Sequence, residues 1–388
     1  MKKQLPPLSL YIHFPWCIQK CPYCDFNSHA VKQGIPESEY IEALLRDLEN
    51  DLPLVWGRKI NTIFMGGGTP SLFSAESMDS LLAGIRARIP LSPNAEITME
   101  ANPGSIENER LSGFRETGIN RVSIGVQSFN DDQLKQLGRI HNADTAIKAI
   151  ESAKRAGFDN FNIDLMFALP NQTVEQALSD METAISLSPT HISYYQLTIE
   201  PNTEFYHKPP LLPDDELAWE IFTQGKNKLA ANSFQQYEVS AYSLEKHHCR
   251  HNTNYWLFGD YLGIGAGAHA KISDANQQTI TRYWKHRHPK EYLASKNNST
   301  IAGQRTLKNN ELVFEFLMNA LRLTNGFDLQ TFQKHTGLER EELHDKLAHF
   351  ISQGLIIWNT DNDTINASEK GQLFLNDILE QCLPAANS

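Results

Sequence analysis

The stretch that decides the fold lies near the N-terminus and reads Leu8-Ser-Leu-Tyr-Ile-His-Phe-Pro-Trp-Cys17-Ile-Gln-Lys-Cys21-Pro-Tyr-Cys24-Asp-Phe26. Its first half is rich in β-forming residues and predicts a strand over Ser9–Phe14. Three of the five cysteines in the chain follow this strand within eight residues. A disulfide scaffold would spread its cysteines more widely, so the spacing favours a metal site in a reducing compartment.

Three thiolates on one tight loop indicate an iron–sulfur cluster. A zinc site completes four ligands with a second CxxC pair or distant histidines, and no second pair follows here. Ordinary clusters take four cysteines, so three leave one iron open. An open iron can chelate the methionine part of S-adenosylmethionine (SAM), which the reduced cluster cleaves to a 5′-deoxyadenosyl radical. The spacing of Cys17, Cys21 and Cys24 resembles the radical-SAM superfamily. A zinc loop or incidental cysteines are the alternatives.

The composition describes an acidic globular protein. The chain has 388 residues, 40% hydrophobic content and a formal net charge of −11. That length predicts one large domain and a smaller one, and the negative charge argues against nucleic acid as a partner. No apolar run reaches the roughly 18 residues of a membrane span, and the start lacks the features of a signal peptide. We expect a cytoplasmic protein.

Short β-rich runs alternate with amphipathic patterns over the first part of the chain. Predicted strands cover Ser9–Phe14, Thr62–Met65, Glu96–Glu100, Arg121–Gly125, Asn160–Leu165 and His191–Thr198. Predicted helices cover Glu37–Leu52, Ala75–Ile89, Ile106–Thr117, Asp144–Gly157, Thr173–Ser186 and Asp214–Asn232. Six β/α units predict a parallel sheet. Because eight would close a TIM barrel, we expect an α/β fold with a partial, TIM-type (βα)6 barrel over residues 9–235, after a tail of residues 1–8.

The rest of the chain divides into two predicted parts. Residues 236–305 are less regular, and the polar stretch 271–305 predicts a linker or excursion. Residues 306–388 predict a mostly helical domain with a winged-helix pattern of helix, turn, helix and two-strand wing. Such a domain can bind DNA, but residues 328–388 hold four Lys/Arg and ten Asp/Glu, a net of −6. A packing or docking module is the favoured interpretation.

Glycines and polar residues follow the predicted strands at the edge where barrel active sites are built. Met65-Gly66-Gly67-Gly68-Thr69-Pro70 ends the second strand, and its glycines predict a close backbone approach to a ligand with free N–H groups. Glu100 closes the third strand, Gln127 follows the fourth and Asp164 closes the fifth, while Arg139 lies in a later turn. Each alone could merely cap a helix. Their occurrence on successive units favours a ligand site.

These motifs resemble the oxygen-independent coproporphyrinogen III oxidase group of the radical-SAM superfamily. The matching stretches are Tyr11–Cys17, Gly66–Pro70, Glu100–Gly104, Gly125–Phe129 and Asn162–Leu165, and the resemblance extends from Leu8 to about Leu379. It implies a [4Fe–4S] cluster held by the three cysteines, with Tyr23 beside them, and SAM contacted by Tyr11, Gly67 and Glu100. The positions that hold a second SAM in the oxidase correspond to Gly68, Thr69, Gln127, Arg139 and Asp164.

Two departures separate this chain from the oxidase itself. The oxidase has a fourth cysteine two residues after the third, where this chain has Phe26, and a longer N-terminal arm. Both departures resemble the sister branch of haem chaperones, the HemW family. The stretch His251-Asn252-Thr-Asn-Tyr255-Trp256 is likewise similar to the HNxxYW motif of that branch.

The HNxxYW stretch admits two interpretations. Histidine is a common haem-iron ligand and aromatic rings pack against porphyrins, so the candidate haem residues are His251, Asn252, Tyr255 and Trp256, with the rival ligands His247, His248 and Cys249. In the alternative, the first two residues hydrogen-bond a loop and the aromatic pair fills the core. The stretch Gly263–His269 follows as a flexible turn near the same site.

We therefore expect a haem chaperone that binds haem and passes it to apo-haemoproteins, such as those of the respiratory chain. An electron donor for the cluster is a further expected partner, and peripheral membrane contact and a homodimer stay open. The first alternative is coproporphyrinogen III oxidase, an enzyme that removes two propionate carboxyl groups. The second is another radical-SAM enzyme, such as a methyltransferase of a tetrapyrrole-like substrate. We expect coproporphyrinogen dehydrogenase activity to be absent and assign no catalytic residue.

Overall fold

Six parallel strands form the centre of the main sheet. The structure is a computed structural model that describes residues 5–32, 34–295 and 300–384, and residues 105–109 without their side chains. Residues 1–4 of the predicted tail and residues 385–388 of the predicted C-terminal domain lie outside this description. The strands are β1 (Leu8–Phe14), β4 (Ile60–Gly67), β5 (Leu91–Ala101), β6 (Arg121–Gln127), β7 (Phe161–Phe167) and β8 (His191–Gln196). Each pairs in parallel with the next, which confirms the predicted partial barrel.

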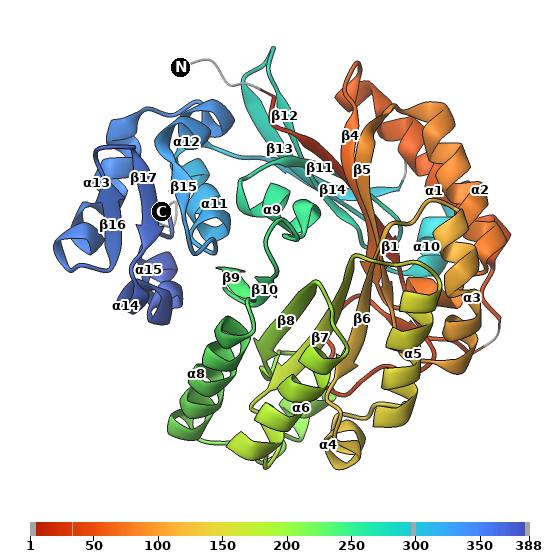
Figure 1. Ribbon diagram of the computed structural model, residues 1–388. Coiled ribbons are helices and arrows are strands. Elements are labelled where there is room, and N and C mark those ends of the chain that lie inside the picture. Colours follow the sequence, from red (N-terminus) through yellow and green to blue (C-terminus); the bar gives the residue numbers. More distant parts are fainter. Residues whose placement is uncertain (1–4, 33, 296–299, 385–388) are drawn as a thin grey trace.

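Helices cover the outer side of these strands (Figure 1). They are α1 (Glu37–Asp51), α2 (Ala75–Arg88), α3 (Ser105–Glu116), α5 (Ala143–Arg155), α6 (Val174–Ser186) and α8 (Asp215–Ala231). Local signals define their starts. Thr173 and Gln176 form a capping box at the start of α6, and the Asp214 side chain accepts a hydrogen bond from Leu217 N at the start of α8.

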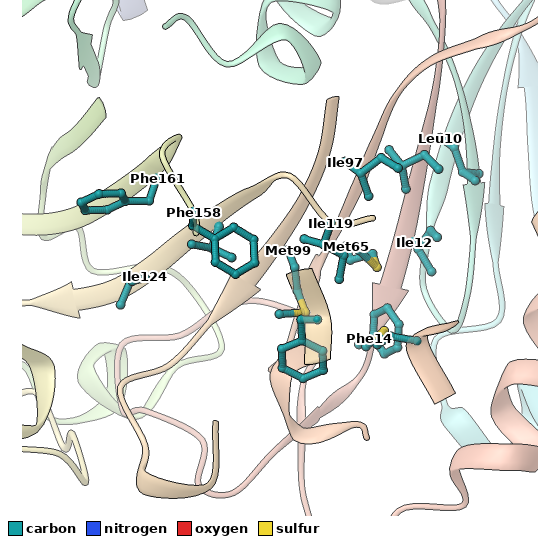
Figure 2. Close-up of a cluster of buried hydrophobic side chains, with 14 of the residues drawn as sticks. Leu10, Ile12, Phe14, Met65, Ile97, Met99, Ile119, Ile124, Phe158 and Phe161 are labelled. Carbon is teal, nitrogen blue, oxygen red and sulfur yellow. The ribbon is translucent and has the colours of Figure 1, made fainter. Parts of the chain in front are cut away.

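The main core lies between the strands and the helices (Figure 2). Residues at alternate positions of β1 point into it, namely Leu10, Ile12 and Phe14, and they meet Met65 of β4 and Met99 of β5. All five side chains are buried. Each contributes roughly 1.5–3 kcal/mol by leaving water, so the position of β1, and of the cysteine loop that follows it, is firmly determined.

The prediction of a linker over residues 271–305 is wrong. β11 (Asp260–Ile264) pairs in parallel with β1, and β12 (His269–Asp274), β13 (Thr279–Lys285) and β14 (Ile301–Thr306) extend the same sheet antiparallel. Helix α10 (Pro289–Ala294) lies between the last two of these strands, and residues 296–299 lie outside the described part. Charged residues such as Lys271 and Lys285 made the stretch look solvent-exposed in the sequence. In the structure both lysines are buried in ion pairs.

The opposite edge of the sheet also ends in antiparallel strands. β10 (Ala241–Ser243) pairs with β8, and β9 (Gln235–Glu238) pairs with β10. Between the two edges, helix α9 (Arg250–Trp256) packs against β1, β4 and β11 and carries the HNxxYW stretch. Short helices that the sequence pattern did not reveal are α4 (Asp131–Gln136) and α7 (Glu204–His207).

The C-terminal part has its own apolar core and lies beside α9 (Figure 1). Its elements are α11 (Asn309–Ala320), β15 (Phe327–Asp328), α12 (Leu329–Thr336), α13 (Arg340–Ser352), β16 (Ile356–Asn359), β17 (Thr364–Ala367), α14 (Glu369–Leu373) and α15 (Leu375–Gln381). Gly337 ends α12 with φ +77, and β17 pairs antiparallel with β16 as the predicted wing. Among the described helices, none is long and apolar enough to cross a membrane.

Candidate functional site: a three-cysteine loop and two cavities

The three cysteines lie on a loop that closes on itself directly after β1. The short strand β2 (Trp16–Cys17) pairs in parallel with β3 (His29–Ala30) and joins the two ends of the loop. Within the loop, Cys24 N donates to Cys21 O at 3.1 Å. The loop therefore lies at the C-terminal edge of the parallel strands, where barrel active sites are built.

Each cysteine sulfur has a polar neighbour. The pairs are Thr69 Oγ1 and Cys17 Sγ at 3.5 Å, Arg139 Nη1 and Cys21 Sγ at 3.5 Å, and Ser28 Oγ and Cys24 Sγ at 3.9 Å. Burial raises the pKa of the Cys17 and Cys24 thiols. Thiolates here therefore need a positive neighbour, and hydrogen bonds to ligand sulfurs are one way in which proteins tune iron–sulfur clusters.

The loop fits a cluster better than a single metal ion. Within residues 5–32, 34–295 and 300–384, no three His, Cys, Asp or Glu side chains are arranged to hold one ion. A zinc site brings all its ligands to one point, whereas a cluster takes one thiolate at each of several iron atoms. The iron charge would also offset the cost of burying the thiolates. Cys17, Cys21 and Cys24 are the residues that would hold a [4Fe–4S] cluster here.

The glycine-rich turn after β4 packs against the cysteine loop. Its N–H groups already have acceptors, which are Phe14 O for Gly68 at 2.6 Å, Trp16 O for Thr69 at 2.7 Å and Glu100 Oε2 for Gly67 at 3.1 Å. The prediction of free N–H groups is therefore wrong. Glycine is required for a different reason, because Gly67 has φ +106 and a Cβ there would lie 2.3 Å from the His13 ring.

Two half-buried carboxyl groups, Glu100 of β5 and Asp164 of β7, lie on strands that are separated by β6. Burial, together with the charge of Asp164, raises the pKa of Glu100 to about 7. Asp164 accepts hydrogen bonds from Ser123 Oγ at 3.1 Å and Asn162 Nδ2 at 2.7 Å, and burial raises its pKa too. The sequence suggested that Asp164 ends its strand, but it lies at the centre of β7. A pKa near 7 lets Glu100 take up or release a proton close to neutral pH, as a group that shares a proton with a ligand must.

Arg139 links the cysteine loop to the strand ends. Its Nη2 donates to Asn102 Oδ1 and to Gly125 O, both at 2.7 Å. Asn102 in turn donates to Thr69 Oγ1 at 2.8 Å, which joins two cysteine partners in one network. Sequence reasoning missed Asn102, although it lies within the stretch Glu100–Gly104.

Gln127 is held by a hydrogen-bond partner that the sequence did not reveal. It ends β6 with a positive φ of 72°, which is uncommon outside glycine. Tyr195 of β8 donates from its hydroxyl to Gln127 Oε1 at 2.7 Å. Any ligand that uses the amide of Gln127 would therefore meet a side chain that is already oriented.

A cavity of about 480 Å³ gathers most of the predicted cofactor residues, and we call it the cluster cavity. Its lining includes Cys17, Cys21, Tyr23, Cys24, Gly67, Gly68, Thr69, Glu100, Gln127, Arg139 and Asp164. Of the predicted cluster and SAM residues, only Tyr11 is missing from this lining. Tyr11 instead lines a neighbouring cavity of about 760 Å³, which we call the aromatic cavity.

The two cavities share part of their walls. Gly67, Glu100 and Phe26 line both of them. Phe26, which stands where the resemblance to the oxidase group places a fourth cysteine, leaves 57% of its surface exposed. A ligand in the aromatic cavity would therefore lie next to a cofactor on the cysteine loop.

The HNxxYW stretch contributes to both cavities, but His251 lines neither. Asn252 and Trp256 line the cluster cavity and Tyr255 lines the aromatic cavity. The His251 ring is 1% exposed, and its nitrogens lie 2.9 Å from Thr62 Oγ1 and 3.0 Å from Tyr255 Oη. Burial lowers its pKa to about 3. The interpretation in which His251 holds the helix in place fits this geometry, and that of a haem ligand does not.

The fold and the cysteine loop define a radical-SAM protein. Residues 11–184 match the Radical SAM superfamily, and residues 307–374 match the HemN C-terminal domain. A solved structure of coproporphyrinogen III oxidase (HemN) from Escherichia coli matches with a TM-score of 0.82 over 97% of this chain and 90% of that chain. Sequence identity to it is 22%, so the match supports the fold alone. Membership of the superfamily implies a [4Fe–4S] cluster and SAM.

Curated relatives show which family within the radical-SAM superfamily the chain belongs to. The chain is 51% identical to "Heme chaperone HemW" of Haemophilus influenzae, over 97% of this chain and 98% of that protein. It is 49% identical to "Heme chaperone HemW" of Escherichia coli with the same coverage. The chain therefore belongs to the HemW family.

Proposed function

We propose that the chain is a haem chaperone, which binds haem and delivers it to apo-haemoproteins. The observation that carries the proposal is the identity of 51% along nearly the whole length to a relative of that name. The aromatic cavity adds a physical argument, since its volume of about 760 Å³ lies in the upper part of the roughly 300–1,000 Å³ range of small-molecule pockets. It has room for a ligand as large as a tetrapyrrole.

In this proposal the cysteine loop is the site of the resident cofactors. Cys17, Cys21 and Cys24 would hold the [4Fe–4S] cluster, which supplies an open iron for SAM and one electron at low potential. Thr69, Ser28 and Arg139 would donate to the sulfurs and orient the loop. Tyr11, Gly67 and Glu100 would face the bound SAM, and Tyr23 would cover the cluster.

A second SAM molecule remains a prediction that rests on resemblance. Its expected residues are Gly68, Thr69, Gln127, Arg139 and Asp164, which all line the cluster cavity. Most of their polar atoms already bond to the protein, for example Arg139 to Asn102 and Gln127 to Tyr195. We therefore propose a single SAM, bound at the open iron.

Coproporphyrinogen III oxidase is the alternative function, because its solved structure shares this fold. Phe26 argues against it, since an exposed phenylalanine stands where the resemblance places a fourth cysteine. The expected partners are apo-haemoproteins, for example of the respiratory chain, and an electron donor for the cluster. The reducing environment that three free loop thiols require is consistent with the cytoplasm.

One pair of assays separates the two functions. Protein with an anaerobically reconstituted cluster is titrated with haemin and followed by its Soret band, and the loaded protein is mixed with an apo-haemoprotein. We expect saturable binding followed by transfer to the acceptor. The same preparation is incubated with SAM, a reductant and coproporphyrinogen III. Turnover to protoporphyrinogen without haem transfer would overturn the proposal.

A further inference from the structure

The aromatic cavity has the chemical features that a haem needs. Aromatic side chains supply flat apolar surface, histidines supply potential iron ligands, and an arginine supplies positive charge for propionates. The cavity lies between the ends of β1, β4 and β5 and the strands β11 to β13, and its lining outside the shared wall is Tyr11, His13, Asn27, Tyr255, Tyr261, Gly267, His269, Trp284 and Arg287.

Most side chains in this lining that could bind iron are already committed to other groups. His13 Nδ1 lies 2.9 Å from Tyr11 Oη, and His13 Nε2 lies 2.9 Å from Asn27 O. The hydroxyl of Tyr255 lies 3.0 Å from His251 Nε2, and that of Tyr261 accepts from an arginine at 3.0 Å. An iron bond to any of these would break an existing hydrogen bond.

His269 differs from these residues. It is exposed at the start of β12, and its imidazole has no hydrogen-bond partner among the residues that the structure describes. Partial burial, with Arg282 and Arg287 nearby, lowers its pKa. Its ring is therefore neutral near pH 7, which is the form that binds metals.

The orientation of His269 is set by its neighbours across the sheet. It pairs with Trp284 of β13, and the two rings stack with centroids 6.2 Å apart and an interplanar angle of 27°. Trp284 in turn pairs with Gly303 of β14, where a Cβ would lie 2.4 Å from the indole. Gly303 thus leaves the space that the indole fills, and the indole supports the imidazole.

Arg287 supplies the positive charge at this cavity. It is exposed on the loop after β13, and no ion pair to its guanidinium occurs within the described ranges. Elsewhere on these strands the arginines are paired, as Arg282 is with Glu315 at 2.6 Å. A free guanidinium at a cavity mouth is suited to a carboxylate, which it can bind through two hydrogen bonds.

We propose that haem occupies the aromatic cavity, with His269 as an axial ligand of the iron and Arg287 paired with a propionate. This proposal rests on the proposed haem-chaperone function and names its binding site. It removes His251 from the ligand role and assigns that role to the end of the stretch Gly263–His269. It also places the haem beside Phe26, and so beside the cluster.

The test is a haemin titration of the full chain with its reconstituted cluster, followed by Soret absorbance and electron paramagnetic resonance. Loss of a metal's supporting partner alone commonly costs 10- to 100-fold in affinity, so His269→Gly should weaken binding by at least about tenfold and change the spin-state signal. Added imidazole should restore the wild-type spectrum in this variant. Arg287→Ala should weaken binding with the spectrum unchanged.

Two further proteins make the outcomes distinguishable. His344→Ala is the matched control, because His344 is an exposed histidine of α13 with 57% of its side chain accessible, and it should behave as wild type. If wild type binds haemin and His269→Gly matches it in affinity and spectrum, the site is overturned while the chaperone function stands. If wild type itself fails to bind haemin, both proposals fail.

Discussion

Gly67 shows how one backbone position couples the cysteine loop to the barrel. Its φ of +106 lies in the region that side chains rarely adopt, and a Cβ would meet the His13 ring at 2.3 Å. That ring cannot move aside freely, because both of its nitrogens are hydrogen-bonded. We predict that Gly67→Ala destabilises the protein by about 1–2 kcal/mol for the backbone and about 1–3 kcal/mol more for overpacking.

Gly57→Ala is the control for this prediction. Gly57 also has a positive φ, +77, but a Cβ there would meet nothing within 4 Å. Both variants should lower the free energy of unfolding in urea, and only Gly67→Ala should also weaken SAM binding to the reconstituted protein. Equal losses in the two variants would mean that the contact with His13 contributes nothing.

At the scale of single residues, the sequence predicted which residues matter better than it predicted what surrounds them. The spacing of Cys17, Cys21 and Cys24 predicted them as cluster ligands, because three thiols on one short loop have few other uses. His251 was singled out by its motif, yet its two ring partners come from β4 and α9 and cannot be read from neighbouring residues. His269 was noted only as the end of a glycine-rich turn, since its exposure and its stacking on Trp284 depend on strand pairing.

At the scale of elements, a buried ion pair joins the β12–β14 extension to the barrel. Lys285 Nζ of β13 lies 2.6 Å from Asp47 Oδ1 and 2.8 Å from Asp51 Oδ2, both on α1. Both lysine and carboxylate side chains are almost completely inaccessible. We predict that Lys285→Met lowers the free energy of unfolding by about 3–5 kcal/mol, because it leaves buried carboxylates without their cation.

A triple variant separates the lost charge from lost packing. Lys285→Met combined with Asp47→Asn and Asp51→Asn removes all three charges, and we expect it to recover most of the stability that the single variant loses. Urea unfolding at neutral pH measures both. If the triple variant were as unstable as Lys285→Met, shape rather than charge would be the cause.

A second prediction at this scale concerns Asp180 of α6. It accepts hydrogen bonds from Ser128 Oγ at 2.6 Å and Phe129 N at 2.7 Å, just after Gln127. Burial raises its pKa from 3.8 to about 6. The folded protein therefore holds a proton that the unfolded chain has lost between about pH 4 and pH 6, so this group makes stability fall as the pH rises through that window.

Asp180→Asn keeps the shape but cannot ionise: its amide oxygen can still accept from Phe129 N, and its amide nitrogen would donate to Ser128 Oγ in place of accepting from it. The stability of wild type minus that of the variant should therefore decrease from about pH 4 to pH 6 and stay constant above it. Chemical unfolding of both proteins at several pH values measures this difference. A difference that does not change with pH would contradict the raised pKa.

Element prediction succeeded where hydrophobic pattern and structure coincide. All six parallel strands and the six main helices were predicted, because apolar periodicity and caps such as Thr173 and Asp214 mark them. The strands β12 to β14 were missed because Lys271 and Lys285 lie in the protein interior. A buried charge reads as a surface residue until its partner is known, and the partners Asp260 and Asp47 are distant in sequence or lie on another element.

For the whole molecule, the decisive feature is that the two cavities share a wall. Gly67, Glu100 and Phe26 line both, and Tyr11, an expected SAM contact, lines the aromatic cavity. SAM at the open iron would therefore lie against the shared wall of the space in which we place haem. A bound SAM would displace solvent from this wall, so the haem would bury more of its solvent-accessible surface against it.

This contact predicts positive coupling between the two ligands. We expect SAM to tighten haemin binding by about fivefold, and haemin must then tighten SAM binding by the same factor, because coupling free energies are reciprocal. Both factors can be measured by titration of the reconstituted protein with each ligand in the presence of the other. Phe26→Ala, which removes part of the shared wall, should reduce both factors together. Weaker haemin binding in the presence of SAM would instead show that the ligands compete for one space, and the arrangement proposed for the aromatic cavity would then be wrong.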